Sequence, residues 1–179
     1  MKQEINVLDY TTEIIKALSK GILLTTKANG RVNTMTIAWG MFGIEWQKPI
    51  FTALVRKGRF TTELLNANPE FTVNIPVGDF DTKILGLAGS KSGRDVDKVK
   101  ALNLTLEKPE IISVPGIKEL PLTLECKVIY KQEQDKNCML FPNVDRFYPQ
   151  DVPSTNCGSN KDFHVAYYGE IVKAYIIKD

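Results

Sequence analysis

Short runs of strand-forming residues, separated by turn residues, dominate the hydrophobic pattern of this chain. The clearest pair is GILLTTK at 21–27 and RVNTMTIAW at 31–39, with Asn29 and Gly30 between them. An Asn-Gly pair favours the two-residue turn that joins antiparallel strands, so these runs predict a β-hairpin. Alternate residues of the second run point to opposite faces, and each face carries both apolar and polar side chains. The pattern predicts a strand that is covered on both sides.

The rest of the pattern predicts more strands than helices. Helices are expected over Tyr10–Ser19, over 60–68 before Pro69, over 82–89, and over 95–103 with Asp95 as its cap. Further strands are expected at 50–56 after Pro49, 70–76, 104–108, 122–134 and 162–178. Helices that do not alternate regularly with strands argue against a doubly wound parallel sheet. We therefore expect a mainly β fold with helical insertions, built as a small antiparallel barrel.

No internal repeat, low-complexity tract or linker divides the sequence, and 179 residues are enough to bury one sizeable core. We expect residues 1–179 to form a single domain. The polar stretch 135–160 contains several prolines and no clear strand or helix pattern. It is expected to be a long excursion over the surface.

Composition narrows the classes of partner. The chain has 43% hydrophobic and 25% charged residues and a net charge of +2, with no basic cluster, so we expect no nucleic-acid partner. No apolar run is long enough to span a bilayer, and MKQEINVLDY lacks the apolar core of a signal peptide. Three cysteines without a CxxC pair are expected to be reduced thiols. These observations predict a soluble, cytoplasmic protein with no membrane partner.

Common catalytic patterns are not found. The glycine-rich stretch GLAGSKSG at 86–93 fits neither GxGxxG nor a Walker loop, and no GxSxG elbow is present. His164 is the single histidine, so a multi-histidine metal site is excluded and we expect no metal. We assign no side chain as a catalytic acid, base or nucleophile.

The segment VRKGRFTTELL at 55–65 has the composition of an anion site. Arg56 and Arg59 flank a glycine, and Thr61 stands near the start of the expected helix. Helix N-termini offer free N–H groups, to which guanidinium and hydroxyl groups add further donors. The alternative is that Thr61 only caps the helix while both arginines are solvated.

A second segment, GSKSGRDVDK at 89–98, brings Ser92 and the Gly93 amide close to Lys98 and other basic residues. Such a loop can surround an anion with backbone donors. The alternative is an exposed polar turn before a capped helix.

The strand segment NTMTIAWG at 33–40 indicates the kind of ligand. It combines polar Asn33 and Thr36 with apolar Met35 and Ile37 and the aromatic Trp39. A flat heteroaromatic ring with a polar edge needs this mixture of donors and apolar surface. The alternative is that Trp39 belongs to the core and Asn33 to a turn.

Taken in order, these segments resemble the flavin reductase-like, FMN-binding split-barrel family, and most of all its flavoredoxin branch. GILLTT, NTMTIAWG, VRKGRFTTELL, FTVNIP, GSKSGRDVDK, LECKV and the closing HVAYYGEI at 164–171 carry the resemblance, which covers most of the chain. It implies an FMN-binding split β-barrel, a homodimer, and FMN held near the subunit interface.

Applied to this sequence, the resemblance assigns each segment a part of the cofactor. It places the flavin ring against the strand segment and the phosphate at 56–61, with the second loop closing over the cofactor. His164, Tyr167 and Tyr168 are expected near the ring. The residues expected to bind the cofactor are Asn33, Met35, Thr36, Ile37, Trp39, Arg56, Arg59, Thr61, Ser92, Gly93, Lys98 and His164.

The function implied is an NAD(P)H-dependent flavin reductase that transfers hydride to bound FMN, with NAD(P)H as a transient donor. This chemistry belongs to the cofactor, which agrees with the lack of a catalytic dyad. Two alternatives stay open. One is a flavoredoxin-type electron carrier that is served by a redox protein partner, and the other is a binding module without redox activity. Residues 135–160 match the family least and are expected to shape access for the electron donor or acceptor.

Overall fold

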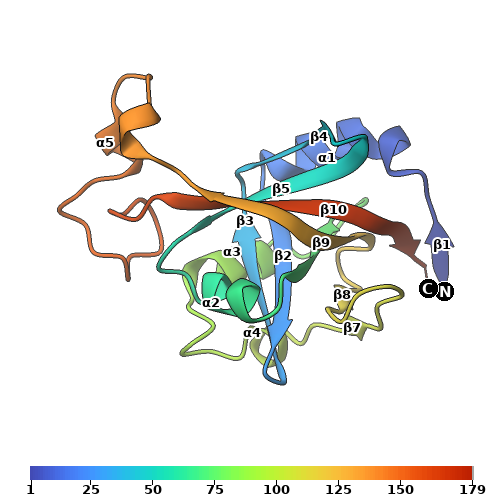
Figure 1. The fold of residues 1–179 in the computed structure, drawn as a ribbon. Coiled ribbons are helices and arrows are strands. Elements are labelled where there is room, and N and C mark those ends of the chain that lie inside the picture. Colours follow the sequence, from blue (N-terminus) through green and yellow to red (C-terminus); the bar gives the residue numbers. More distant parts are fainter. Residues whose placement is uncertain (179) are drawn as a thin grey trace.

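The computed structural model describes residues 1–178, and an antiparallel sheet forms most of it (Figure 1). The strand order is β3-β2-β6-β9-β10-β5-β4, and β1 pairs with β10. The strands are β1 (Lys2–Glu4), β2 (Ile22–Ala28), β3 (Arg31–Ile37), β4 (Gly40–Glu45), β5 (Lys48–Arg56), β6 (Glu70–Ile75), β9 (Leu122–Glu133) and β10 (His164–Ile177). A separate two-stranded sheet consists of β7 (Leu106–Glu107) and β8 (Gly116–Ile117). The expected mainly β fold with helical insertions is confirmed.

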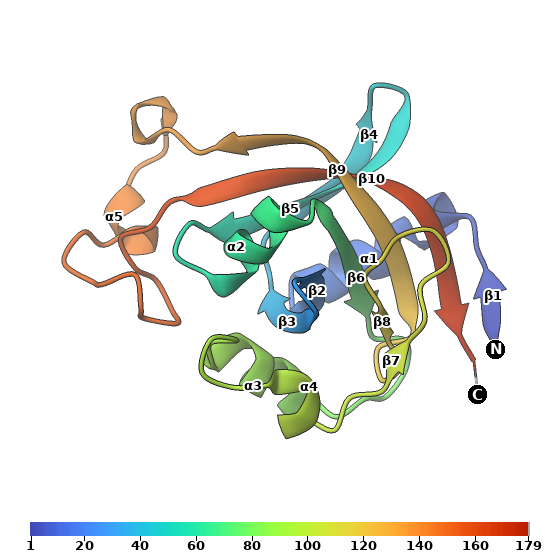
Figure 2. The same cartoon turned by 60° about the horizontal axis from the view of Figure 1, so that its bottom comes forward.

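The helices are short and lie between the strands. They are the 3-10 helices η1 (Val7–Tyr10) and η2 (Lys136–Cys138) and the α-helices α1 (Thr11–Leu18), α2 (Phe60–Ala67), α3 (Lys83–Ser90), α4 (Lys98–Ala101) and α5 (Val144–Phe147). Helices α3 and α4 lie beside each other and pack on β3, as Figure 2 shows. No helix of residues 1–178 combines the length and the apolar character needed to cross a membrane.

The predicted hairpin is present as β2 and β3. Asn29 and Gly30 at its turn have φ of 51° and 75°, the left-handed values that a two-residue hairpin turn requires. Asn33 and Thr34 face opposite sides of β3 and are 4% and 0% exposed. The prediction of a strand covered on both sides is therefore confirmed.

The core lies between the curled sheet and α1. Phe51, Phe71 and Tyr167 from β5, β6 and β10 are almost completely buried, and Ile14 and Leu18 of α1 pack against the same cluster. Burying these side chains contributes roughly 1.5–3 kcal/mol each. The core thus holds β5 and β10, which carry Arg56 and His164 of the predicted cofactor site, in fixed positions.

Two elements of the structure differ from the prediction. Strand β4 was not predicted, because its residues are largely exposed and its turn has Trp46 and Gln47 at positive φ instead of an Asn-Gly pair. The expected helix at 95–103 is only the four residues of α4, and Asp97, not Asp95, caps it by accepting a hydrogen bond from the Lys100 amide.

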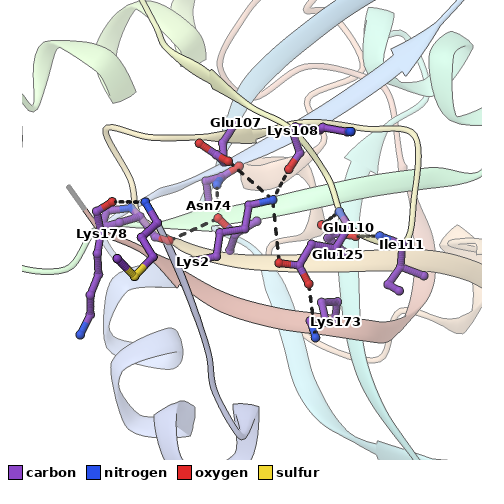
Figure 3. Close-up of polar contacts among 12 residues, drawn as sticks. Lys2, Asn74, Glu107, Lys108, Glu110, Ile111, Glu125, Lys173 and Lys178 are labelled. Atoms are coloured by element: carbon purple, nitrogen blue, oxygen red, sulfur yellow. Dashed lines mark hydrogen bonds and ion pairs between the residues drawn. The ribbon is translucent and has the colours of Figure 1, made fainter.

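A polar network fastens β1 and the 107–112 segment to the sheet (Figure 3). The buried Glu125 carboxylate on β9 accepts hydrogen bonds from the backbone amides of Glu110 and Ile111 at 2.7 and 2.8 Å. Lys173 of β10 pairs with Glu110 at 3.3 Å, and Lys2 of β1 donates to the Lys108 carbonyl. This end of the sheet is thereby closed by charged groups that are paired with one another.

Residues 135–160 extend away from the sheet, at the left of Figure 1. Much of the segment is exposed to solvent, and Leu140 is 95% exposed. The expectation of a surface excursion is therefore correct in part. However, it also carries η2 and α5, and it buries Tyr148 (3% exposed) and Asn160 (0%) against the sheet.

Candidate functional site

Two adjoining pockets contain all twelve residues that the sequence singled out. The first, of about 280 Å³, lies between β3, the start of α2 and the loop after α3. The second, of about 350 Å³, lies between the end of β3, β5, the start of β10 and the excursion. Met35, Arg59 and Gly89 line both. Together the two volumes fall in the range of ligand pockets, roughly 300–1,000 Å³.

The predicted residues divide between these pockets. The first holds Asn33, Thr61, Ser92, Gly93 and Lys98. The second holds Thr36, Ile37, Trp39, Arg56 and His164.

In the first pocket, Thr61 joins α2 to β3. The N-cap position of α2 is Arg59, and no side chain caps this helix, so the alternative in which Thr61 is the cap is wrong. The Thr61 hydroxyl instead accepts a hydrogen bond from Asn33 Nδ2 at 3.1 Å. Both residues are buried. Nor does Asn33 belong to a turn, because it lies within β3.

The loop after α3 is fastened over the same pocket. The Ser92 hydroxyl accepts from the Arg94 amide at 3.1 Å, and Arg31 donates to the Gly93 carbonyl at 2.6 Å. A Cβ atom added to Gly93 would lie 2.0 Å from Asn33 Oδ1, so only glycine fits there. The loop is therefore packed against β3 and is not the free polar turn of the alternative interpretation.

Lys98 is a buried cation that lines the first pocket. Its side chain is 5% exposed, and Nζ donates to the carbonyls of Thr34 and Ala88 at 2.9 and 2.8 Å. Since an ammonium group has three N–H donors, one is left for a ligand. Burial, and then the nearby charge of Arg59, lower the pKa of Lys98 to about 8. Neutral pH therefore leaves Lys98 charged, with a charge that a bound anion would stabilise.

Arg56 lies in the second pocket, apart from Thr61 in the first. Its guanidinium donates to the backbone carbonyls of Asp162 and Phe147 at 2.7 and 3.0 Å, and less closely to that of Asn160. Burial lowers the pKa of Arg56. These hydrogen bonds use three of the five guanidinium N–H donors, so Arg56 anchors the excursion. Arg56 lines the second pocket and Thr61 the first, so the structure does not place the two side chains in one pocket.

Trp39 and His164 form the aromatic side of the second pocket. Their ring centroids lie 5.0 Å apart, and Trp39 is 39% exposed, so it is not a core residue. His164 Nδ1 lies 3.0 Å from the Tyr148 hydroxyl. Burial, followed by the charges of Arg56 and Arg59, lowers the pKa of His164 to about 3. The imidazole is therefore neutral at physiological pH.

The side chains of Thr36, Tyr167 and Tyr168 make contacts that the sequence did not suggest. The Thr36 hydroxyl donates to the Leu85 carbonyl at 2.7 Å, so this bond takes up its donor. Tyr167 is buried in the core, and Tyr168 contacts Tyr130 with ring centroids 5.1 Å apart. Neither tyrosine is among the described residues that line the two pockets, so these pockets give no support to the expectation that Tyr167 and Tyr168 approach the ring.

Sequence reasoning missed the wall that the excursion supplies. Ser154 and Thr155 line the first pocket, and Cys157, Gly158 and Ser159 line the second. Arg59 donates to the Cys157 carbonyl at 2.5 Å and holds this wall in place. These contacts join residues far apart in the chain through backbone carbonyls, which leave no pattern in the sequence.

The two pockets differ in chemistry. Cationic, hydroxyl and amide groups converge on the first, which suits an anionic group such as a phosphate. Met35, Ile37 and Trp39 give the second apolar and aromatic surface, which suits a planar ring.

Comparison with known proteins identifies the family of the chain. The family described as "Flavin reductase like domain" matches residues 18–179. An uncharacterized protein of Archaeoglobus fulgidus is 31% identical over 101 residues, or 56% of either chain. YddH, an uncharacterized protein of Escherichia coli, is 31% identical over 111 residues, 60% of this chain and 58% of its own. The match thus spans little more than half the length of these curated relatives.

Solved structures give the same fold. A flavoredoxin from Methanosarcina acetivorans is 25% identical, with a TM-score of 0.62 over 88% of this chain and 68% of its own. An FMN-binding domain of flavin reductase-like enzymes from Shewanella baltica is 17% identical, with a TM-score of 0.66 over 98% and 77%. The expected split-barrel fold is confirmed.

Proposed function

The chain belongs to the flavin reductase-like domain family, and on that premise we propose that it binds FMN and works as an NAD(P)H-dependent flavin reductase. The observation that carries the proposal is the joining of a cationic pocket to an aromatic one through Met35, Arg59 and Gly89. A flavin mononucleotide has this same division, with a phosphate at one end and a planar ring at the other.

The residues of the first pocket fit a phosphate group. Arg59 and Lys98 supply positive charge, the Ser92 and Thr61 hydroxyls line the same space, and the Gly93 backbone closes it without a side chain. Hydrogen bonds from charged donors are shorter and stronger than neutral ones. Arg59 and not Arg56 is the arginine proposed for the phosphate, since Arg59 lines the first pocket and Arg56 lines only the second.

The residues of the second pocket fit a flavin ring. Met35, Ile37 and Trp39 would hold its apolar part, while His164 and the Cys157–Ser159 wall limit its position. Bound FMN would supply the redox chemistry by accepting hydride from NAD(P)H. The protein would orient the ring, exclude water from one face and leave the other accessible.

The proposal is tested by anaerobic stopped-flow mixing of the FMN-loaded protein with NADH and with NADPH, following loss of the oxidised flavin absorbance. Reduction by at least one nicotinamide is expected. Reduction by dithionite alone, with neither nicotinamide effective at millimolar concentration, would contradict the reductase and leave an electron carrier. A protein that takes up no flavin would contradict both.

The second candidate is a flavoredoxin-type electron carrier that receives electrons from a redox protein. The observation that favours it is the structural similarity to the flavoredoxin from Methanosarcina acetivorans at 25% identity. Tight retention of FMN with negligible NAD(P)H oxidation would distinguish this carrier from the reductase.

We also propose that the protein is a homodimer. An exposed apolar surface, here called the hairpin patch, covers the β4–β5 hairpin and the neighbouring strands. It consists of the exposed residues Met41, Ile44, Trp46 and Tyr130 around the half-buried Tyr168. Contiguous apolar surface of this kind marks protein contacts, and a second copy of the chain is the proposed occupant.

The proposed location of the protein is the cytoplasm. The thiols of Cys138 and Cys157 are exposed and form no disulfide, which favours a reducing compartment.

A further inference from the structure

A chain of hydrogen bonds from the excursion determines which nitrogen of His164 carries the proton. It begins at the His164 backbone amide, which can only donate and which lies 3.3 Å from Gln134 Oε1. The facing Gln134 atom must therefore be the carbonyl oxygen, because the amide nitrogen would bring two donors together. The Gln134 backbone amide donates back to the His164 carbonyl at 2.9 Å and holds the two residues in register.

The second bond orients the Tyr148 hydroxyl. Tyr148 Oη lies 2.8 Å from the same Gln134 oxygen, which only accepts, so the single hydroxyl proton is directed at Gln134. Tyr148 is 3% exposed and is stacked on Phe163 with ring centroids 4.6 Å apart, so its position is fixed by packing.

The third bond sets the imidazole. Tyr148 Oη lies 3.0 Å from His164 Nδ1, and its own proton is already used, so Nδ1 must carry the proton and donate. A neutral imidazole has one such proton, so Nε2 keeps its lone pair. Within residues 1–178, Nε2 has no hydrogen-bond partner, and His164 lines the second pocket beside Trp39.

We propose that Tyr148 and Gln134 are positioning residues that hold His164 as the Nδ1-protonated tautomer, so that Nε2 presents a hydrogen-bond acceptor to the second pocket. Next to Nε2, the second pocket therefore favours a ligand group that donates an N–H or O–H hydrogen bond and disfavours an acceptor or an anion. This ligand preference rests on the proposed function, whereas the tautomer does not. The charges of Arg56 and Arg59 support the neutral form, because they oppose protonation of Nε2.

The single histidine makes the tautomer directly measurable. In protein labelled with ¹⁵N-imidazole histidine, the ¹⁵N spectrum of the flavin-free protein should show a protonated Nδ1 and, far downfield, an unprotonated Nε2. Tyr148→Phe should shift the proton toward Nε2. Gln134→Glu keeps an acceptor at the same place and should retain the wild-type tautomer. Tyr130→Phe is the matched control, since Tyr130 makes the same kind of bond to Gln132 (2.9 Å) outside the pockets.

Protonated Nε2 in the wild-type protein, or an unchanged tautomer in Tyr148→Phe, would overturn the proposal. FMN and NADPH are then added separately, with binding followed by flavin fluorescence or by equilibrium dialysis. An upfield shift of Nε2 with at least one of them supports the ligand preference. If both bind and Nε2 does not move, that preference is wrong although the proposed function stands. If neither binds, the proposed function fails while the tautomer result stands.

Discussion

Asn33 Nδ2 donates a hydrogen bond to Thr61 Oγ1, 3.1 Å away, in the interior of the protein. This bond ties β3 to the first turn of α2, and Gly93 packs on the same Asn33 side chain. Three segments that are distant in sequence thus meet at Asn33. A pocket whose walls are already fastened to one another loses little freedom when a ligand binds.

Gly93→Ala should weaken FMN binding tenfold or more. The added Cβ would lie 2.0 Å from Asn33 Oδ1 and 2.9 Å from the Phe60 ring, so either the loop or Asn33 must move. Titration of FMN by quenching of its fluorescence measures the effect. Gly86→Ala is the matched control. It lies in α3 with nothing within 4 Å of its Cβ, and in a helix it should stabilise the fold by about 0.5–1 kcal/mol. Equal FMN affinity of both variants would contradict the role of the loop.

Arg59→Ala should weaken binding of FMN by about 1.5–3 kcal/mol, the range for hydrogen bonds to charged groups. Riboflavin, which has no phosphate, should lose less affinity than FMN, because for riboflavin only the contact of Arg59 with the Cys157 wall is removed. Parallel titrations of both flavins measure the difference. Lys57→Ala serves as the control, because Lys57 pairs with Glu133 and is not among the residues lining either pocket. Equal losses for FMN and riboflavin would exclude a phosphate role for Arg59.

Binding of FMN should weaken as pH rises above about 8. Lys98, with its pKa lowered to about 8 by burial and by Arg59, is charged below that pH and neutral above it. Since an anion favours the charged form, binding above pH 8 requires proton uptake, and the affinity should fall by up to about tenfold per pH unit. Titrations from pH 6.5 to 9.5 measure the slope. Lys98→Met should remove it, and a slope that persists in this variant would assign the effect to another group.

The rate of flavin reduction by NAD(P)H should be nearly constant between about pH 6 and 8. The pKa of His164 is lowered to about 3, so its imidazole stays neutral throughout this range, and no other histidine is present. Stopped-flow rates across the range measure this. A step in the rate near pH 6.5 would show that His164 titrates normally and would contradict its burial next to Arg56 and Arg59.

Replacing Ile44 in the hairpin patch by Asp should shift the protein from dimer to monomer. Ile44 is 62% exposed, and a charge there would lose its hydration on association. Sedimentation at micromolar concentration, with and without FMN, measures the mass. Leu8→Asp, at a similarly exposed position on η1, should leave the mass unchanged. A wild-type species of 20.1 kDa would contradict the homodimer itself.

The sequence was informative where local chemistry determines local structure. Asn29-Gly30 predicted the β2–β3 turn because few residue pairs adopt two left-handed conformations. The sequence also grouped Ser92 and Gly93 with basic residues in one loop, and this loop lines the first pocket. The turn at Trp46 and Gln47 uses the same geometry with residues that rarely adopt it, so β4 was missed.

Long-range contacts account for the remaining differences. Arg56 looked like a second phosphate ligand from its spacing to Arg59, but it donates to the carbonyls of residues 147, 160 and 162 and lines the second pocket instead of the first. Similarly, the tautomer of His164 depends on Tyr148 and Gln134, which lie outside the segments that resemble the family. Backbone carbonyls and hydroxyl orientations such as these follow from the folded structure and not from residue spacing.

The central place of β10 in the sheet has a consequence for how the chain folds. Strand β10 joins β9 on one side to β5 on the other, and it pairs His164 with Arg56 across more than half of the sequence. Within residues 1–178, the β4–β5 hairpin pairs with the other strands of the main sheet through β10 alone. Forming such non-local pairs requires closing long loops first, which slows folding. During synthesis, the second pocket therefore stays open until β10 has emerged from the ribosome and paired with β5.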